Sequence, residues 1–555
     1  MTGFAVKAQA PVWDNALAFG SSNSGVSASA MTSNGDVVLA GSYRGTISLS
    51  GMVLTSSGVD DGFVAKWSLS SRRFVWAVSL GGPLTEGVTA VTVSGTHVYV
   101  AGHFNSANVN FGAASLANTS ASAGIGFDLF VAKITDLGTN AAFVWAKSAS
   151  GSGSESATSM AVNGASVYVA GYFEGAVSFD SNTLTSSGLR DGFVAKLTDV
   201  GSSASYTWAQ QVNGSGQEFA WAVACNGPSV YLTGTFQNAA TLGPLSLTNA
   251  NQGGEEVFVA KLTDMGPTSN FVWAQQANGT ASDIPRALAA VGNNLYITGS
   301  FQGATVRFGN TVLNNATPPD TDVFVAKMVD AGQSGAFVWA QQAGGPGHEW
   351  ASALVASGNN VFVAGTFTGV TTAFNSIVLP NSNSRGGTND LFVAKLIDAG
   401  ASGNFMWATA AGGPGSDQAR TLSLSSADTL IVGGSVVVPA TFGRFTLPGA
   451  GPAPTAFVAS LTNNLGLSNN SPTSLIGMQL SPNPAHTTAT VQLPAIPGAA
   501  TATLTLLDAL GRTLRTQTAF PHARAELNLT GLAPGLYAVR VAAGAATATQ
   551  RLVVE

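Results

Sequence analysis

The chain has 555 residues, of which only 9% are charged and 45% are hydrophobic, and its formal net charge is −6 at pH 7. No window reaches the roughly 18 uninterrupted apolar residues that a membrane-spanning helix needs, so we expect no membrane span. The 22 lysines and arginines form no basic block, which excludes nucleic acid as a partner. Cys225 is the one cysteine, so no intrachain disulfide can form, and we interpret it as a small packed hydrophobe.

Residues 1–10 contain a small-x-small triplet, Ala8-Gln9-Ala10, of the kind that signal peptidase cleaves. Pro11 and the first strand-like segment follow directly. We therefore expect residues 1–10 to be the remnant of a signal peptide, and an ordinary disordered N-terminus is the alternative interpretation.

From residue 11 onward three phrases recur along the chain. A tryptophan returns every 63 to 69 residues, at Trp13, Trp76, Trp145, Trp208, Trp273, Trp339 and Trp407. The phrase Phe-Val-Ala-Lys starts at Phe63, Phe130, Phe193, Phe258, Phe324 and Phe392, with a degenerate copy at Phe457. A third phrase, Val-Tyr-Val-Ala-Gly at Val98, recurs with small changes. The repeat region therefore contains seven units.

Each unit contains four short β-rich runs separated by Gly, Asn, Asp and Ser, which predicts four strands. The runs are apolar at nearly every position, as expected for strands that neighbouring sheets cover on both faces. A smaller phrase between the second and third runs, such as Phe111-Gly112, predicts a further hairpin at the outer rim. Together these features predict an all-β fold, a seven-bladed β-propeller with four-stranded blades over residues 11–461.

The order of the runs predicts how the propeller closes. The first run, at Val12 and Trp13, is of the tryptophan type, and no tryptophan run follows the last one, Phe457 to Leu461. We therefore expect the N-terminal strand to complete the seventh blade, which joins both ends of the repeat region in one sheet and leaves no free edge.

Residues 12–461 resemble the bacterial seven-bladed propeller-repeat family. The resemblance rests on the Asp-x-Phe-Val-Ala-Lys phrase, the tryptophan strand ending in Gly-Gly and the Gly-Asn-Val-Tyr-Val-x-Gly strand, which repeat in register. It implies the fold and an extracellular habit, and it fixes no reaction.

The composition of the sequence changes after Leu461, and the repeated phrases end there. Residues 462–475 are rich in Asn, Ser, Thr and Gly, which predicts a flexible linker. Residues 476–555 alternate short strand-like runs with Pro and Gly turns, which predicts a small Ig-like β-sandwich.

Four landmarks in residues 476–555 resemble the type A sorting domain of the type IX secretion system of Bacteroidota. They are the Ser-Pro-Asn-Pro segment with Pro482, Asn483 and Pro484, the Asp-x-x-Gly-Arg hairpin with Gly511, the Leu-x-Pro-Gly-x-Tyr turn with Pro534, Gly535 and Tyr537, and a basic residue plus apolar triplet at 551–554. The resemblance implies that the type IX machinery carries the chain through the outer membrane and that a sortase-like peptidase removes the domain. The product is then expected at the cell surface or in the medium.

No motif of a known catalytic site is present. The five histidines are scattered, and the sequence lacks a Gly-x-Ser-x-Gly elbow, phosphate-binding and calcium-binding loops, and the Ser-x-Asp-x-Gly-x-x-Trp box of propeller sialidases. We therefore expect no catalytic residue, no metal, no cofactor and no enzymatic activity.

Three sets of acids recur once per unit. One set precedes the first run: Glu86, Glu155, Glu218, Asp283, Glu349 and Asp417. A second lies two residues before the Phe of Phe-Val-Ala-Lys: Asp61, Asp128, Asp191, Glu256, Asp322 and Asp390. A residue that repeats in successive blades is expected to have a structural role that all blades share. We therefore interpret both sets as acceptors for turn amides or as partners of lysines. The alternative is a ring of carboxylates near the channel that binds cations. The third set, Asp136, Asp199, Asp264, Asp330 and Asp398, lies two residues before Gly and predicts turns.

Ligand specificity is expected where the blades differ. The first and third residues after the acid of the first run vary, and blades three to six place two Trp, one Phe and two Arg there. The candidate ligand-binding residues are Phe219, Trp221, Arg286, Trp350 and Arg420, together with Glu218 and Glu349. Aromatic faces beside Arg and carboxylates suit a polysaccharide or a peptide. Packing between blades is the other explanation of the aromatic residues.

These features together predict an exported, monomeric binding or adhesion scaffold. A polysaccharide-active hydrolase or lyase with an unrecognised site is one alternative, and a structural component of a surface layer is the other.

Overall fold

The computed structural model describes residues 10–20, 23–119, 126–250, 254–449, 451–462, 479–493, 501–508, 512–520, 523–543 and 546–555. They belong to two compact units, Met1–Asn463 and Asn464–Glu555. Residues 1–9 of the expected signal-peptide remnant, residues 463–475 of the expected linker and Gly511 lie outside the described stretches. None of these stretches contains a helix long and apolar enough to span a membrane.

Seven groups of four antiparallel strands make up most of the described part of the first unit, and each group is called a sheet below. Five of them are separate, and two lie within six-stranded sheets that also include a hairpin of the following group. The first strand of each sheet lies at one edge. The first strands are β2 (Ser24–Met31), β8 (Glu86–Ser94), β14 (Glu155–Asn163), β20 (Phe219–Asn226), β27 (Asp283–Val291), β33 (Glu349–Ser357) and β39 (Gln418–Leu424). The second strands are β3 (Val37–Tyr43), β9 (His97–Phe104), β15 (Ser166–Phe173), β21 (Ser229–Phe236), β28 (Asn294–Phe301), β34 (Asn360–Phe367) and β40 (Thr429–Val436).

The third strand of each sheet contains the Phe-Val-Ala-Lys phrase, and the fourth contains the recurring tryptophan. The third strands are β6 (Asp61–Ser68), β12 (Asp128–Asp136), β18 (Asp191–Asp199), β24 (Glu256–Asp264), β31 (Asp322–Asp330), β37 (Asp390–Asp398) and β43 (Thr455–Thr462). The fourth strands are β7 (Arg73–Leu80), β13 (Ala141–Gly151), β19 (Ala204–Gly214), β25 (Ser269–Gln276), β32 (Gly335–Ala343), β38 (Gly403–Ala411) and β1 (Trp13–Ala18).

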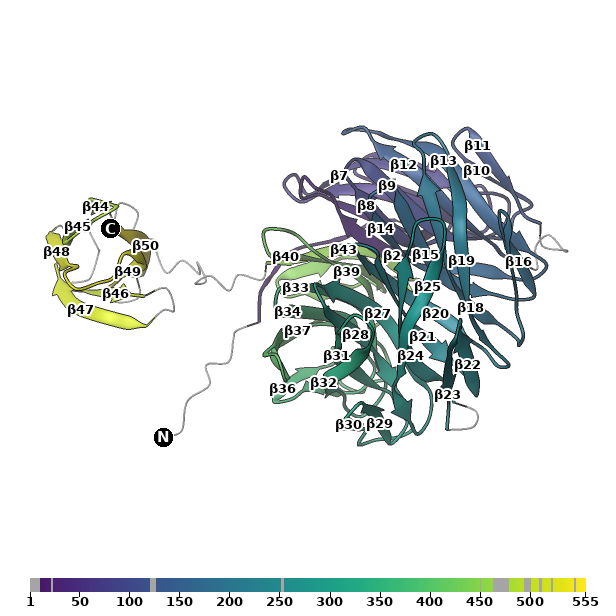
Figure 1. Ribbon diagram of the computed structural model, residues 1–555. Helices are drawn as coiled ribbons and strands as arrows, with labels where there is room; N and C mark the ends of the chain where they lie inside the picture. Colours follow the sequence, from purple (N-terminus) through teal and green to yellow (C-terminus); the bar gives the residue numbers. More distant parts are fainter. Residues whose placement is uncertain are drawn as a thin grey trace. The chain divides into compact units, whose positions relative to one another are not determined.

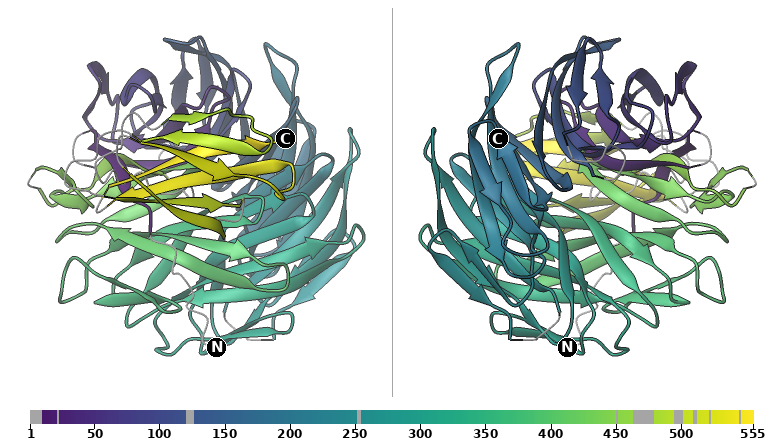
Figure 2. Two further views of the ribbon diagram at one scale, coloured as in Figure 1. Left: turned by 90° about the vertical axis from the view of Figure 1, so that its left-hand side faces the viewer. Right: turned by 90° about the vertical axis from the view of Figure 1, so that its right-hand side faces the viewer.

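The sheets form a closed ring. The first strands of successive sheets contact one another in chain order, and β39 contacts β2. Figure 1 shows the first strands toward the middle of the unit, and Figure 2 shows the sheets following one another around it from purple to light green. This arrangement is a β-propeller whose first strands line the axis, as the sequence predicts.

The N-terminal strand closes the ring as predicted. β1 pairs antiparallel with β43, with Ala16 opposite Ala459 and Ala18 opposite Phe457. The order of the last sheet is therefore β1-β43-β40-β39, and no edge is left between the two ends of the repeat region. β43 extends to Thr462, one residue beyond the predicted boundary of the repeats.

The third strands are buried between neighbouring sheets. β6 is buried at all eight of its positions, and β12 at its first seven. Phe130, for example, packs on Phe111 with ring centroids 5.0 Å apart. This confirms that both faces of the strands are covered, which explains why the runs are apolar without alternation. Cys225 is partly buried against the same core, and burial raises the pKa of its thiol to about 11, as expected of a packed residue.

A short hairpin follows the second strand of each sheet. The hairpins are β4 (Thr46–Leu49) with β5 (Met52–Thr55), β10 (Asn108–Phe111) with β11 (Ala114–Ala117), β16 (Ala176–Phe179) with β17 (Asn182–Thr185), β22 (Ala239–Leu242) with β23 (Leu245–Thr248), β29 (Thr305–Phe308) with β30 (Thr311–Asn314), β35 (Thr371–Phe374) with β36 (Ile377–Pro380), and β41 (Ala440–Phe442) with β42 (Phe445–Leu447). β16 pairs with the end of β13, β22 with the end of β19, and β29 with β26 (Asn278–Gly279). Single bridges join the hairpins that start with β10, β35 and β41 to the preceding sheet in the same way. In the described residues, six of the seven predicted rim hairpins therefore also tie their sheet to the preceding one.

A buried ion pair joins successive sheets, and we call it the inter-blade latch. Asp330, at the end of β31, accepts from Lys261 Nζ at 2.6 Å and Tyr231 Oη at 2.8 Å through one oxygen. Its other oxygen accepts from Trp273 Nε1 at 3.0 Å and from its own turn amide, Gly332 N, at 2.9 Å. Four donors thus serve the roughly four lone-pair sites of one carboxylate.

Strand register explains the latch. Lys261 lies opposite Tyr231 on β21 and opposite Trp273 on β25, so the three side chains form one row across the sheet. The same lysine–aspartate pair recurs at 2.6 to 2.8 Å between Lys66 and Asp136, Lys133 and Asp199, Lys196 and Asp264, and Lys327 and Asp398. The aspartates predicted to form turns do bond the turn glycine, and they hold the preceding sheet as well.

The hydrogen bonds of the latch lower the pKa of its aspartate. Burial alone would raise the pKa of Asp330, but the bonds from Lys261, Tyr231 and Trp273 outweigh burial and lower it. Asp199, Asp264 and Asp398 are shifted in the same direction for the same reasons. The aspartates are therefore ionised at neutral pH, as an ion pair requires.

The latch is missing, among the described residues, on both sides of the sheet that the N-terminal strand completes. Lys395 is fully buried and its Nζ has no hydrogen-bond partner there. Burial lowers the pKa of Lys395, and the negative charge of Asp428 partly opposes this shift. The sequence has Asn463 at the position where other blades have the aspartate of the latch. At the next boundary Ser460 and Leu69 replace both members of the pair, and the Trp13 Nε1 is left without an acceptor.

The second unit is a small β-sandwich, as predicted. One sheet has the order β44 (Gln479–Ser481), β45 (Thr488–Gln492) and β48 (Arg524–Asn528). The other has the order β47 (Thr513–Ala519), β46 (Ala502–Leu507), β49 (Gly535–Ala543) and β50 (Ala546–Val554). Val491 and Leu527 from the first sheet share one core with Leu504, Val539 and Leu552 from the second.

The latch makes a prediction about two lysines that look alike in sequence. Lys261→Met leaves the buried Asp330 without its cation, so we expect the free energy of unfolding to fall by about 3 kcal/mol. Lys395→Met removes a buried ammonium that has no hydrogen-bond partner among the described residues and lies 5.3 Å from the centre of the Phe362 ring, so we expect unchanged or higher stability. Thermal and denaturant unfolding followed by circular dichroism compares the two variants. A greater loss in Lys395→Met than in Lys261→Met would contradict the role given to the latch.

Candidate functional site

Every first strand of the propeller contains a β-bulge at the same place. The bulged residue is the third after the position of the recurring acid: Ser27, Thr89, Thr158, Trp221, Arg286, Ser352 and Arg420. A bulge leaves this residue unpaired and turns its side chain away from the regular pleat. One of the two positions that vary between blades, the third after the acid, therefore has a special backbone conformation, whereas Phe219 and Trp350, at the first position, pair regularly.

Trp221 is the centre of a packed group between two sheets. Its ring stacks on Phe219 with centroids 5.0 Å apart and planes inclined by 16°, and the Arg286 guanidinium of the next sheet lies 4.3 Å from its centroid. Tyr172 meets Phe219 edge to face at 5.1 Å. Because a ring and a guanidinium both lie against the indole, little of its surface is left for a ligand. The three predicted residues come together, but as packing between blades.

Trp350 is arranged differently. It is 37% exposed and stacks on His348 with ring centroids 5.3 Å apart and planes inclined by 16°. His348 Nε2 lies 3.7 Å from Asp320 Oδ1. In the described residues Trp350 makes no ring contact with Trp221, so the predicted aromatic residues form two groups and not one. Trp350 keeps an open surface beside an imidazole and a carboxylate.

Arg420 lies two sheets beyond Arg286 at the equivalent bulge. Its Nη2 donates to Gln418 Oε1 at 2.8 Å, and the side chain is exposed. Burial of part of each side chain lowers the pKa of Arg286 and of Arg420, with Glu255 opposing the shift at Arg286. Both remain cations at neutral pH because an arginine starts from a pKa above 12.

Glu218 and Glu349, which the sequence predicts as ligand-binding residues, accept hydrogen bonds from backbone amides inside the propeller. Both are completely buried. Glu218 accepts from Gln237 N at 3.3 Å, and Glu349 accepts from Gly345 N at 3.2 Å. A buried carboxyl group next to a glycine-rich turn accepts hydrogen bonds from amides that the strands do not pair. The interpretation of this set as acceptors for turn amides is confirmed for Glu86, Glu218, Glu349 and Asp417.

The two sets of buried acids meet in pairs across the sheet boundaries. Glu155 interacts with Asp128 of the preceding sheet, and Glu349 with Asp322. Burial, followed by the neighbouring carboxylate, raises the pKa of Glu155 and of Glu349 to about 9. Each of these glutamates therefore holds a proton at neutral pH. In the described residues, no three His, Cys, Asp or Glu side chains gather as a metal site.

The acid pairs also explain a recurring glycine. A Cβ on Gly279 would lie 1.8 Å from Asp283 Oδ2, and one on Gly344 would lie 2.1 Å from Asp322 Oδ1. No larger residue fits where the fourth strand passes the carboxyl groups.

The landmarks of the second unit have structural roles that bring distant parts of the chain together. Asn483 donates to Arg551 O at 2.7 Å and accepts from Val553 N at 2.8 Å, so the Ser-Pro-Asn-Pro segment with Pro482 and Pro484 lies along β50. Tyr537 Oη donates to Ala533 O at 2.8 Å across the turn that contains Pro534 and Gly535.

Residues 479–555 match the family model of the secretion system C-terminal sorting domain. The chain therefore carries a type IX sorting domain. This domain marks proteins that the type IX secretion system exports to the cell surface or into the medium, and the chain is such an exported protein. The sorting domain is the unit whose Asn483 and Tyr537 bonds are described above.

Two solved structures of the parainfluenza virus 5 hemagglutinin-neuraminidase are similar to the chain at a low level. One, with the ligand DANA, is 9% identical, covers 67% of this chain and 89% of its own, and has a TM-score of 0.30. The ectodomain structure is 7% identical, covers 67% of this chain and 81% of its own, and has a TM-score of 0.33. No curated protein matches the chain.

The protonated glutamates predict how stability depends on pH. The pKa of Glu155 rises from 4.5 to about 9 on folding, so its contribution is fully present below pH 4.5 and is lost as the pH rises through about 9. We expect the free energy of unfolding to fall between about pH 5 and pH 9 and Glu155→Gln to flatten this slope. Denaturant unfolding followed by tryptophan fluorescence measures it.

Asp428→Asn is the matched control for Glu155→Gln, because Asp428 is exposed and an asparagine tolerates its positive φ of 57°. The control should keep the slope of the unchanged protein. An equal slope in Glu155→Gln and in the unchanged protein would contradict the raised pKa of Glu155.

Proposed function

We propose that the exported propeller is a binding or adhesion scaffold whose ligand, a polysaccharide or a peptide, contacts the bulged strands near the axis. Export by the type IX system supports the extracellular setting. Trp221, Arg286 and Arg420, which differ from the residues at the same place in other blades, occupy one repeated bulge, and bulges often re-aim side chains at functional sites.

Trp350 is the observation that carries this proposal. It is among the exposed large hydrophobic residues, and it sits directly after the buried Glu349 at the start of β33. One face of its ring lies against His348. An exposed indole face accepts the C–H groups of a sugar or a peptide side chain, and the neighbouring polar groups accept or donate hydrogen bonds.

The Trp221 group supports the scaffold and does not form the contact surface in this proposal. Phe219 and Arg286 already occupy positions against its ring. A cation over a largely desolvated indole contributes up to about 2 kcal/mol, so the group joins two blades at the axis. Trp221 thus serves as the natural control for Trp350.

A polysaccharide-active enzyme is the second candidate, and one observation favours it. His348 and Asp320 lie 3.7 Å apart beside the exposed Trp350, and an imidazole paired with a carboxylate can act as a general acid or base. New reducing ends or unsaturated products from a polysaccharide incubated with the protein would favour this candidate over a scaffold.

Two tryptophan variants test the binding proposal. Trp350→Ala removes an exposed face, so we expect glycan-array and cell-adhesion binding to fall about tenfold while the melting temperature changes little. Trp221→Ala removes a packed ring, so we expect a loss of about 3 kcal/mol in stability. The proposal is wrong if Trp350→Ala binds as well as the unchanged protein to every ligand that the latter recognises.

A further inference from the structure

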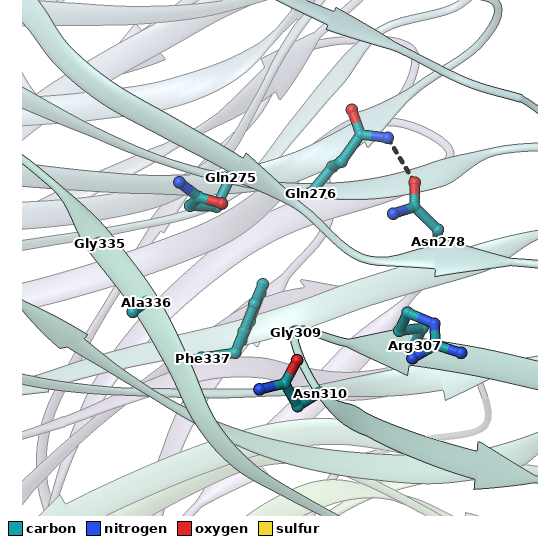
Figure 3. Close-up of a pocket in the computed structure, with 9 residues that line it drawn as sticks. All are labelled: Gln275, Gln276, Asn278, Arg307, Gly309, Asn310, Gly335, Ala336 and Phe337. Atoms are coloured by element: carbon teal, nitrogen blue, oxygen red, sulfur yellow. Dashed lines mark hydrogen bonds between the residues drawn. The ribbon is translucent and has the colours of Figure 1, made fainter.

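A pocket lies at the perimeter of the propeller, on the fourth strands and away from the bulges of the first strands. It has a volume of about 420 Å³ and lies between β25 and β32, at the turn of the rim hairpin β29–β30. Volumes of roughly 300–1,000 Å³ are usual for sites that bind small ligands. Its lining includes Gln275, Gln276, Asn278, Arg307, Asn310 and Phe337, which Figure 3 shows as sticks.

The fold uses only part of this polar lining. Gln276 Nε2 donates to Thr248 O at 2.9 Å and also to Asn278 Oδ1, so these amides hold the edge of the hairpin β22–β23. The side chains of Gln275, Arg307 and Asn310 are exposed and form no hydrogen bond or ion pair with any described residue. A cation and two amides are therefore available in one pocket.

Phe337 supplies an apolar wall. Its ring packs edge to face on Phe308 at 5.3 Å and is only partly buried. Phe337 stands near Asn310 and Gly309 in Figure 3. The pocket thus combines a positive charge, amides that both donate and accept, and an aromatic surface.

The repeat builds this pocket twice. A second pocket, of about 350 Å³, lies one sheet earlier and includes Gln210, Gln211, Asn213, Thr241 and Gly243. These residues precede Gln275, Gln276, Asn278, Arg307 and Gly309 by 65 or 66 positions and occupy the same places on strand and hairpin. Thr241 stands where the first pocket has Arg307. The two pockets therefore share two glutamines and one asparagine. They differ in charge, and Pro244 stands where the first pocket has Asn310.

We infer that the perimeter pocket binds a carboxylated polysaccharide. The Arg307 guanidinium pairs with the carboxylate of a uronate residue, because its planar fork matches a carboxylate. Gln275 and Asn310 bond the hydroxyls, which need partners that donate and accept, and Phe337 faces the C–H groups of the ring. The Thr241 pocket lacks the cation and binds no carboxylate.

Calorimetric titration of the full chain tests this inference. The probes are oligomers of galacturonate, glucuronate and mannuronate, their methyl esters, sulfated oligomers, and an oligoglutamate peptide. We expect at least one uronate oligomer to bind, and esterification or Arg307→Thr to weaken binding about tenfold, as loss of a charge-assisted bond does. Arg385→Thr removes another exposed arginine and should change nothing.

Several results would overturn the inference. They are no binding of any uronate oligomer, equal binding of acid and ester, equal losses in Arg307→Thr and Arg385→Thr, or stronger binding of the peptide or the sulfated oligomers. The melting temperature of each variant separates a loss of binding from a loss of folding. Because Trp350 is unchanged in every variant, failure here leaves the axial proposal open to its own test.

Discussion

The lysine and aspartate that meet at the boundary between two sheets set the geometry on which the propeller depends. Asp330 is buried, and four donors from two successive sheets converge on it. Burying the Asp330 carboxylate with fewer donors would cost much free energy. The two sheets are therefore expected to stack in the one position that places Lys261 and Trp273 against Asp330. Hydrophobic packing supplies most of the stability of the propeller, and the latch determines the relative position in which two neighbouring sheets stack.

The latches and acid pairs also explain why the chain has so little charge at its surface. Six of its eight lysines are buried in the third strands, and both members of most boundary acid pairs are buried as well. Residues that repeat in every blade are thus used inside the fold. In the two proposals, recognition falls to residues that do not repeat, namely Trp350 near the axis and Arg307 at the rim.

Much of the fold could be predicted from sequence. The buried strands repeat the same apolar phrases in every blade, and the strand of Trp13 precedes the first complete repeat, which predicted how the ring closes. The bulges could not be predicted, since a register shift depends on how two backbones pair. The burial of Glu218 and Glu349 could not be predicted, because the sequence does not show whether the backbone N–H groups of a glycine-rich turn point inward to a side chain or outward to solvent. The latch was missed although a signal existed: lysine and the next aspartate recur together, and both are replaced together at Ser460 and Leu69.

A double-mutant cycle on Lys261→Met and Asp330→Asn tests most directly whether the latch couples the sheets. The two side chains are 2.6 Å apart and buried, so their free energies of unfolding should not add. We expect a coupling energy of about 2 kcal/mol, measured by denaturant unfolding of the single and double variants. Additive effects of the two substitutions, with a coupling energy near zero, would contradict the account.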